Sequence, residues 1–206
     1  MTVPVETEIE LRRLSLFGTP LAVQVMPEAA SLNGALVSAL APLIASAPEG
    51  PGEAWRLAVE PEGAAAAALE GLVARALALV QSMSGSSPSS EPSRTTLEVL
   101  RAGQGVAVGS QPAAAWCARY VLDDGGCASR RDYGARFEAQ DPRGVGPVMY
   151  APHLTIADPA GPTLGISQTV GLKTGAILVH PGWLLHGIET YSGPQAFVSL
   201  VICFGR

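Results

Sequence analysis

The sequence predicts an α+β, mainly β fold, in which flanking N-terminal helices pack on a double-stranded jelly roll. Two patterns predict it: the strongest helix signal lies before residue 84, whereas short runs rich in Val, Ile, Leu and aromatic residues recur between turn signals after Thr95. Such evenly spaced short strands are typical of sandwiches and barrels rather than of βαβ units. With 206 residues, 48% of them hydrophobic and 15% charged, the chain is long enough for one well-buried domain.

The N-terminal third is expected to contain an extended segment and two helices. Residues 9–26 form the extended segment. The first helix is expected to begin at the N-cap residue Ser31 and to continue through residue 46, unless Pro42 kinks or ends it, and a turn cluster follows at 47–53. The alanine-rich run 64–83 is expected to form the second helix, because its larger apolar residues recur on one helical face.

These patterns divide a single domain, residues 1–206, into three parts. Residues 1–83 are the N-terminal strand and helical flank, and residues 96–206 are the jelly-roll core. The polar, serine-rich segment between them, residues 84–95, is expected to be a flexible linker or loop.

Charge and cysteine usage favour a cytoplasmic location. The net charge of −5 argues against a nucleic-acid or anionic-membrane partner, since either would need a basic face. The first residues have no basic region followed by an apolar core, so no secretory signal is expected, and Glu70 and Arg75 interrupt the most apolar helix. Cys117, Cys127 and Cys203 form no C-x-x-C pair, and we expect packed, reduced thiols.

The segment GAILVHPGWLLHG, residues 175–187, has the spacing of one half of a metal site in a jelly roll. Gly175 permits a tight turn into a strand, and Pro181 fixes a hairpin. The returning strand then projects His186 into the mouth of the barrel. The pattern resembles the G-x5-P-x-G-x2-H signature of cupin and oxygenase barrels, with Trp183 at the second glycine.

Six segments, taken in order and spacing, resemble a bacterial protein family assigned to the 2-oxoglutarate/Fe(II)-dependent oxygenase superfamily. The resemblance covers most of the chain and is weakest at 47–95. It implies a cupin-like double-stranded β-helix, with Fe(II) and 2-oxoglutarate as cofactors for hydroxylation by O2. The segments are LFGTPL (16–21), LN (32–33), YVLDDGG (120–126), DPRG (141–144), MYAPHLTI (149–156) and HPGWLLHGIETY (180–191).

The remaining groups that the resemblance implies are replaced in this chain. The family's first metal motif, H-x-H-P, falls within residues 103–121, where its histidines become Gly109 and Gln111 and its proline is Pro112. Glycine has no donor atom, and a neutral amide is a poor ligand for Fe(II). Phe197 stands where the family has an arginine that holds 2-oxoglutarate. We therefore expect a degenerate metal site with weak or no oxygenase activity. Fe(II) and 2-oxoglutarate are implied by the resemblance only, and the alternative that the chain binds no cofactor stays open.

The three histidines have different expected roles. His153 lies in a family segment and is expected to be structural. His186 is either the distal metal ligand or a hydrogen-bonded core imidazole. His180 faces His186 across the hairpin, so the two side chains are placed to converge. With Glu189 they would rebuild a metal site; the alternative for His180 is a partly exposed position at the end of a strand.

Four residues are expected to bind a ligand in the barrel, namely Gln111, Arg119, Tyr120 and Trp183, with Trp116 also lining or roofing the cavity. Arg119 supplies a relocated anion clamp in this interpretation, and otherwise faces outward from the barrel.

Three functions stay open. The first is an oxygenase, although with a degenerate site. The second is a non-catalytic jelly roll that binds a small polar or anionic molecule in its cavity. The third is an oligomerising scaffold, with a homodimer formed through a sheet or through the alanine-rich helix. No nucleic acid or membrane is expected as a partner.

Overall fold

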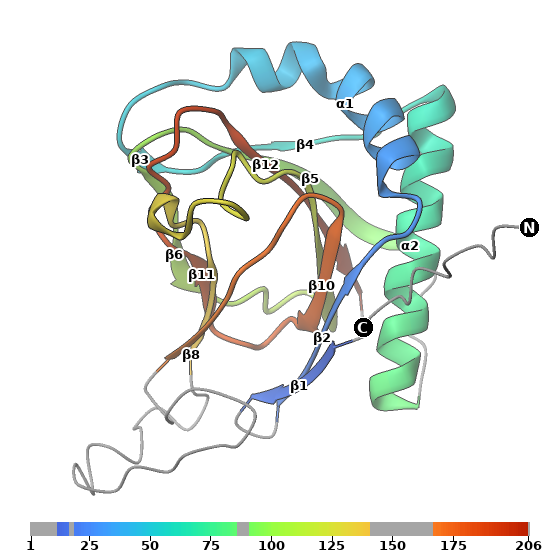
Figure 1. Ribbon diagram of the computed structural model, residues 1–206. Helices are drawn as coiled ribbons and strands as arrows, with labels where there is room; N and C mark the ends of the chain where they lie inside the picture. Colours follow the sequence, from blue (N-terminus) through green and yellow to red (C-terminus); the bar gives the residue numbers. More distant parts are fainter. Residues whose placement is uncertain (1–11, 17–18, 86–90, 141–166, 206) are drawn as a thin grey trace, which may run out of the picture.

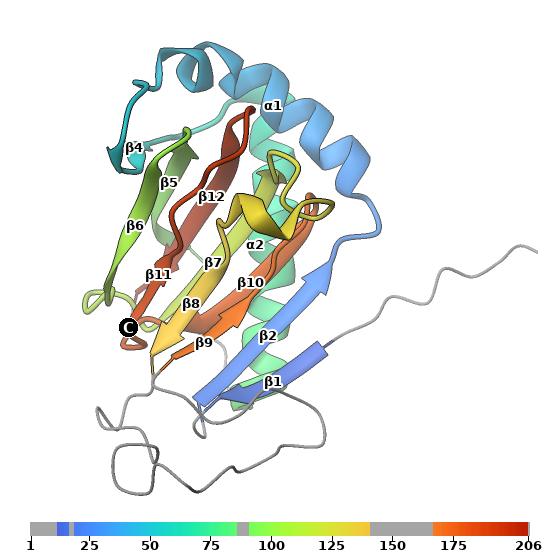
Figure 2. The ribbon, with the colours of Figure 1, turned by 60° about the vertical axis from the view of Figure 1, so that its left-hand side comes forward.

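The computed structural model describes residues 12–16, 19–85, 91–140 and 167–205. Within these ranges two sheets face each other, and two helices cover one side of the larger sheet (Figures 1 and 2). Its elements are β1 (Arg12–Leu16), β2 (Thr19–Val25), α1 (Ala29–Ser46), β3 (Gly52–Glu53), β4 (Trp55–Ala58), α2 (Gly63–Ser84), β5 (Pro92–Leu100), β6 (Gln104–Gly109), β7 (Trp116–Asp123), a 3-10 turn (Arg131–Tyr133), β8 (Phe137–Gln140), β9 (Ser167–Val170), β10 (Ala176–Pro181), β11 (His186–Ile188) and β12 (Phe197–Phe204).

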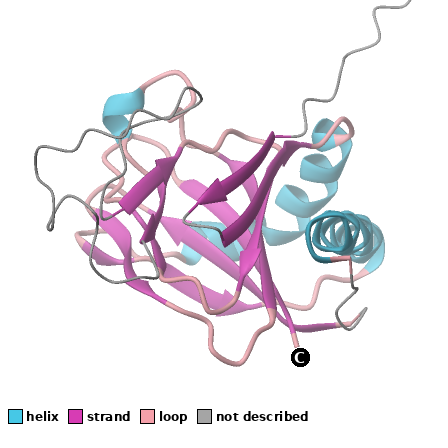
Figure 3. Ribbon diagram, turned by 90° about the horizontal axis from the view of Figure 1, so that it is seen from below, coloured by secondary structure: helices cyan, strands magenta, loops and turns pink. Residues whose placement is uncertain are grey.

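The larger sheet has the order β1-β2-β10-β7-β12-β5-β4, and the smaller sheet has the order β3-β6-β11-β8-β9. Neighbouring strands are antiparallel except β3 and β6, which are parallel. Figure 3 shows the sheets around a common interior with the helices on one side. This arrangement confirms the predicted mainly β fold with N-terminal helices.

The larger sheet is buried on both faces, which explains the unbroken apolar run of β12. We call the face that packs on the helices the outer face and the face toward the smaller sheet the inner face. Because side chains alternate along a strand, every second residue of β12 lies on each face. Val198, Leu200, Ile202 and Phe204 join the helix-side core, while Phe197, Ser199, Val201 and Cys203 lie on the inner face.

Both predicted helices are present, with ends that differ by one or two residues from the prediction. α1 begins two residues before Ser31, whose hydroxyl donates to the Glu28 carbonyl instead of capping the helix. Pro42 lies inside α1 and does not end it. α2 ends at Ser84, and the following Gly85, with a φ of 71°, provides the left-handed cap that favours glycine. Its buried face, with Leu72 fully buried, packs on the larger sheet.

The predicted division of the chain is too simple. The N-terminal flank contributes β1, β2 and β4 to the larger sheet and β3 to the smaller one. Short strands in the 47–58 region were not predicted, because they have few residues and no clear alternation. α2 continues to Ser84 and β5 begins at Pro92, so the predicted linker 84–95 has regular structure at both ends.

Length and composition alone would allow α1 and α2 to cross a membrane. This is weak evidence, because core helices of soluble proteins pass the same test. Here α2 contributes Leu72, Leu79 and Val80 to the core on the outer face.

Candidate functional site

A cavity of about 470 Å³ lies between the two sheets, beside the β6–β11 pair. We call it the inner cavity. Strands from both sheets supply its lining. The polar and charged side chains of this lining include Arg56, Arg94, Glu98, Gln111, Arg119 and His186.

Gly109 and His186 lie directly opposite each other on β6 and β11. A Cβ atom added to Gly109 would meet nothing within 4 Å, so the space beside the imidazole is open. Gly109 is the position to which the resemblance assigns the first metal-binding histidine. Within the described ranges no three His, Cys, Asp or Glu side chains come together as metal ligands. These residues therefore do not fit the three-ligand site that Fe(II) needs in such oxygenases.

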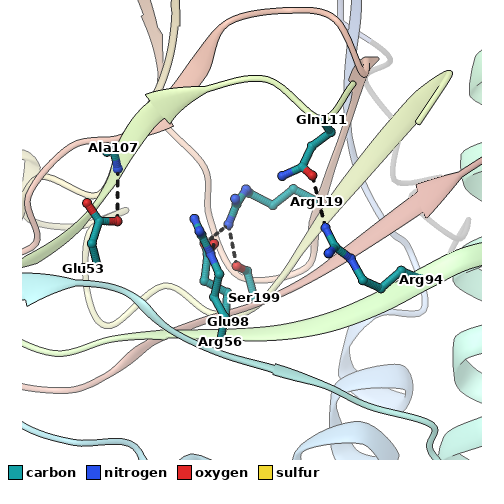
Figure 4. A network of polar contacts seen from close by, with 8 residues as sticks. All are labelled: Glu53, Arg56, Arg94, Glu98, Ala107, Gln111, Arg119 and Ser199. Carbon is teal, nitrogen blue, oxygen red and sulfur yellow. Dashed lines mark hydrogen bonds and ion pairs between the residues drawn. The ribbon is translucent and has the colours of Figure 1, made fainter. Parts of the chain in front are cut away.

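Gln111 lies on the inner cavity and its amide oxygen accepts a hydrogen bond from Arg94 at 3.1 Å (Figure 4). The side chain at the second position of the metal motif is thus engaged by a cation. An arginine neighbour suits an anionic or carbonyl acceptor.

Arg119 points inward from β7 and is only 2% exposed, so the alternative of an outward-facing residue is wrong. One of its terminal nitrogens donates to the Glu98 carboxylate and, at 2.7 Å, to the Ser199 hydroxyl. Glu98 is buried too and accepts a second hydrogen bond from Arg56 Nε at 2.9 Å (Figure 4). Arg119 Nε is buried and has no hydrogen-bond partner among the described residues.

Electrostatics keep the buried Glu98 carboxylate ionised. Burial alone would raise the pKa of Glu98, but the guanidinium groups of Arg119 and Arg56 outweigh burial and lower it. Three arginines and one glutamate are the charged side chains that the described part of the chain places on the inner cavity. An anion entering the cavity would therefore meet an excess of positive charge.

The imidazoles of His180 and His186 converge as predicted, with ring centroids 4.3 Å apart. The predicted hairpin is wrong, however, because the turn at Pro181-Gly182 joins β10 of the larger sheet to β11 of the smaller sheet. His186 also stacks on Phe137 at 5.2 Å. His180 is 1% exposed, so the alternative of a partly exposed strand end is wrong. His180 Nδ1 lies 2.9 Å from the Pro181 carbonyl oxygen, and His186 Nδ1 lies 2.9 Å from the Leu184 carbonyl oxygen. A neutral imidazole with its proton on Nδ1 donates a hydrogen bond to such a carbonyl.

Burial holds both imidazoles in the neutral form. It lowers the pKa of His186 to about 4, and together with the neighbouring His186 it lowers the pKa of His180 well below its usual value. Neutral imidazoles are able to bind metal, but the predicted third ligand is elsewhere. The Glu189 carboxylate accepts two hydrogen bonds from Arg136, at 2.6 and 3.0 Å, in an exposed ion pair. The rebuilt site that includes Glu189 is therefore not formed.

Three aromatic residues do not lie where they were predicted. Tyr120 follows Arg119 on β7 and so lies on the outer face, where its hydroxyl donates to Asn33 Oδ1 at 2.6 Å. Trp116 packs on the same outer core. Trp183, in the turn after β10, is 53% exposed and does not line the inner cavity. The expectation that these residues line the cavity is wrong.

Phe197 lies on the inner face, is fully buried and packs near the Tyr191 ring, with centroids 6.4 Å apart. His153 lies outside the described residues. Ligand binding by Gln111 and Arg119 stays a prediction, and the structure places both on the inner cavity.

Sequence reasoning missed Glu98, Arg56 and Arg94. A usable signal existed for Glu98, because it stands inside TLEVL, one of the short apolar runs after Thr95 that were expected to form strands. A carboxylate in such a strand needs a buried cation, and Arg119 stands in a comparable run. Their pairing depends on β12, which lies between β5 and β7 in the sheet.

No protein-family model matches the chain, and no curated protein matches its sequence. Solved structures with a similar fold do exist. A prolyl-4-hydroxylase from Pseudomonas putida has a TM-score of 0.62 at 11% identity, over 93% of this chain and 95% of that one.

Two further structures are similar. The non-heme alpha-ketoglutarate-dependent carbocyclase SnoK from nogalamycin biosynthesis has a TM-score of 0.60 at 11% identity, over 91% of this chain and 79% of its own. HygX from Streptomyces hygroscopicus, solved with nickel and 2-oxoglutarate, has a TM-score of 0.58 at 14% identity, over 91% and 83%. At such low sequence identities the similarity shows the fold alone. The chain has the double-stranded β-helix fold of the 2-oxoglutarate/Fe(II) oxygenases.

Proposed function

We propose that this chain keeps the oxygenase fold without its iron site, and that the inner cavity binds a small anion through arginine side chains. On this proposal oxygenase activity is weak or absent. The ligand carries a carboxylate or phosphate group, which are the groups that guanidinium donors recognise best.

The observation that carries the loss of iron chemistry is the pairing of Gly109 with His186. An iron centre of this type needs three protein ligands and open positions for its substrates. On the inner cavity the described residues offer the imidazole of His186, opposite a bare backbone and near the amide of Gln111. His180 packs against His186, but no third His, Cys, Asp or Glu among the described residues joins the two imidazoles.

The anion site is supported by the charges around the inner cavity. Arg56, Arg94 and Arg119 line it, whereas Glu98 is the carboxylate that faces them. The buried Arg119 Nε has no hydrogen-bond partner within the described ranges, and an unpaired buried donor is costly. An oxygen atom of a bound anion would satisfy it. A cavity of about 470 Å³ is within the size range of small-molecule sites.

The iron part of the proposal is tested by comparing the natural chain with the double variant Gly109→His/Gln111→Asp. The backbone at Gly109 leaves room for the Cβ atom of the new side chain, which would meet nothing within 4 Å. We expect the natural chain, purified without chelators, to hold far less than one equivalent of iron or zinc and not to turn over 2-oxoglutarate with Fe(II) and ascorbate. The variant is expected to bind about one equivalent of Ni(II) by calorimetry. Stoichiometric iron or 2-oxoglutarate turnover in the natural chain would contradict the proposal.

The anion part is tested by calorimetry with 2-oxoglutarate, succinate and inorganic phosphate. We expect at least one of them to bind, and Arg94→Gln to weaken binding about tenfold, as loss of one charge-assisted hydrogen bond implies. Arg131→Gln, at an exposed arginine outside the inner cavity, is the matched control and should bind normally. Equal affinity in both variants, or no binding of any of the three anions, would refute this part.

Homodimer formation and a cytoplasmic location stay predictions. Size-exclusion chromatography with light scattering tests the first of them.

A further inference from the structure

A row of four chemically active side chains crosses the inner face of the larger sheet. Arg94 on β5 is paired with Cys203 on β12, Cys203 with Cys117 on β7, and Cys117 with His180 on β10. The two sulfur atoms are 3.5 Å apart. Cys117 and Cys203, 0% and 4% exposed, form a small cluster with Ala114 and Val201, apart from the two main cores. Arg94 also belongs to the anion site proposed above, but the contact between the two cysteines does not.

The backbone geometry around the two thiols suits a disulfide. Directly opposed residues on antiparallel strands have Cα atoms about 4.5–5.5 Å apart, inside the range of about 4.4–6.8 Å that disulfides span. The sulfur atoms need to approach by about 1.5 Å to reach bonding distance. Rotation of the side chains is enough for that, so the strands can keep their register.

The two cysteines also differ in character. Hydrogen bonding between the two thiols lowers the pKa of Cys203 to about 6, and burial opposes this change. Arg94, which is paired with Cys203 across the sheet, favours the Cys203 thiolate further. The same hydrogen bond and burial raise the pKa of Cys117. Cys203 is thus the better nucleophile, and Cys117 keeps its proton. Burial raises the pKa of Cys127 to about 11, so it lacks such activation.

We propose that Cys117 and Cys203 form a reversible intramolecular disulfide when the protein meets a peroxide. The Cys203 sulfur attacks one peroxide oxygen, the O–O bond breaks, and hydroxide leaves as water after taking up a proton. The Cys117 sulfur then attacks the resulting sulfenic acid. The S–S bond forms, the S–O bond breaks, and the hydroxyl departs as water with the Cys117 proton. Two thiols lose two electrons in total, and one hydrogen peroxide becomes two water molecules.

The test is a peptide map after brief treatment with equimolar hydrogen peroxide and alkylation under denaturing conditions. Trypsin places the three cysteines in separate peptides, residues 102–119, 120–130 and 174–206. We expect alkylatable thiols to fall from three to one, with peptides 102–119 and 174–206 joined and lighter by two hydrogens. Dithiothreitol should restore all three thiols.

Serine variants assign the roles. Cys117→Ser should leave a Cys203 sulfenic acid that dimedone traps, whereas Cys203→Ser should leave Cys117 reduced. Cys127→Ser is the matched control and should form the disulfide as the natural chain does. Three alkylatable thiols after peroxide, a bond that involves Cys127, or oxidation of Cys203 to a sulfinic acid in place of the bond would overturn the proposal. The map of the natural chain decides this even if a variant fails to fold.

Discussion

The two faces of the larger sheet are both buried, yet their chemistry differs. The outer face packs on α1 and α2 through an apolar core that includes Leu97, Ile177 and Leu200. The inner face, built by the same strands, carries Glu98, Arg119 and Ser199 in a buried hydrogen-bonded cluster. Neighbouring residues of one strand therefore meet opposite environments.

The difference indicates where function resides. Well-packed apolar residues commonly give equal or greater stability than a buried ion pair, because ions are costly to remove from water. The outer face conforms to that rule and serves packing. The inner face retains charges beside a cavity, as a ligand-binding surface would. Measurements of unfolding free energy and anion affinity in variants of each face separate these two roles.

Glu98→Leu is expected to lower the free energy of unfolding by about 3–5 kcal/mol, because it leaves Arg119 buried without its counter-charge. Adding Arg119→Met should recover most of that loss, although anion binding should not return. Urea unfolding of the single and double variants measures both effects. A double variant as unstable as the single one would show that the ion pair itself stabilises the fold, and the contrast between the faces would fail.

Acid is expected to destabilise the protein through His186. The unfolded imidazole binds a proton near pH 6.5, but the folded one does so only at about pH 4. The unfolded state therefore holds more protons in this window, and stability present above pH 6.5 is lost as the pH falls toward 4. The full loss is on the order of 3 kcal/mol.

Urea unfolding between pH 7 and pH 4 measures this loss, with His186→Asn as the comparison. The asparagine amide can still donate to the Leu184 carbonyl but does not titrate. The difference between the two curves should shrink as the pH falls. A constant difference would mean that His186 is not held neutral on the inner face.

Tyr120→Phe is expected to lower the free energy of unfolding by about 1 kcal/mol, because it removes the hydrogen bond to Asn33 on the outer face. Anion affinity should stay unchanged. A weaker anion complex in this variant, measured by calorimetry, would place Tyr120 in the function of the inner cavity after all.

The helices were predictable because their signals are local. The alanine-rich run fixed α2 to within one residue at each end, and the proximity of His180 and His186 followed from the short turn between β10 and β11, although these strands belong to different sheets and do not form the predicted hairpin. β3 and β4 were missed because such short strands depend on pairing with β6 and β5, which is not visible in their own sequences.

Part of the candidate site was predictable as well, because the spacing of a sequence motif is also a local signal. The spacing of the motifs placed Gly109 at the metal position, and the structure pairs it with His186. The faces of β7 were assigned inconsistently, since Arg119 and Tyr120 are adjacent and cannot both point into one cavity. Arg56 and Arg94 come from β4 and β5, and only the assembled sheet brings them to Glu98 and Gln111.

The position of β12 has a consequence for biogenesis. This strand lies between β5 and β7, so one edge of each of those strands stays unpaired until residues 197–204 leave the ribosome, although β5 can pair with β4 and β7 with β10 before then. Such non-local pairing raises the contact order and slows folding. In the meantime two apolar strand edges are open to wrong partners. Nascent chains stalled before β12 should accordingly depend on chaperones, and loss of this strand should yield insoluble protein instead of a smaller folded barrel.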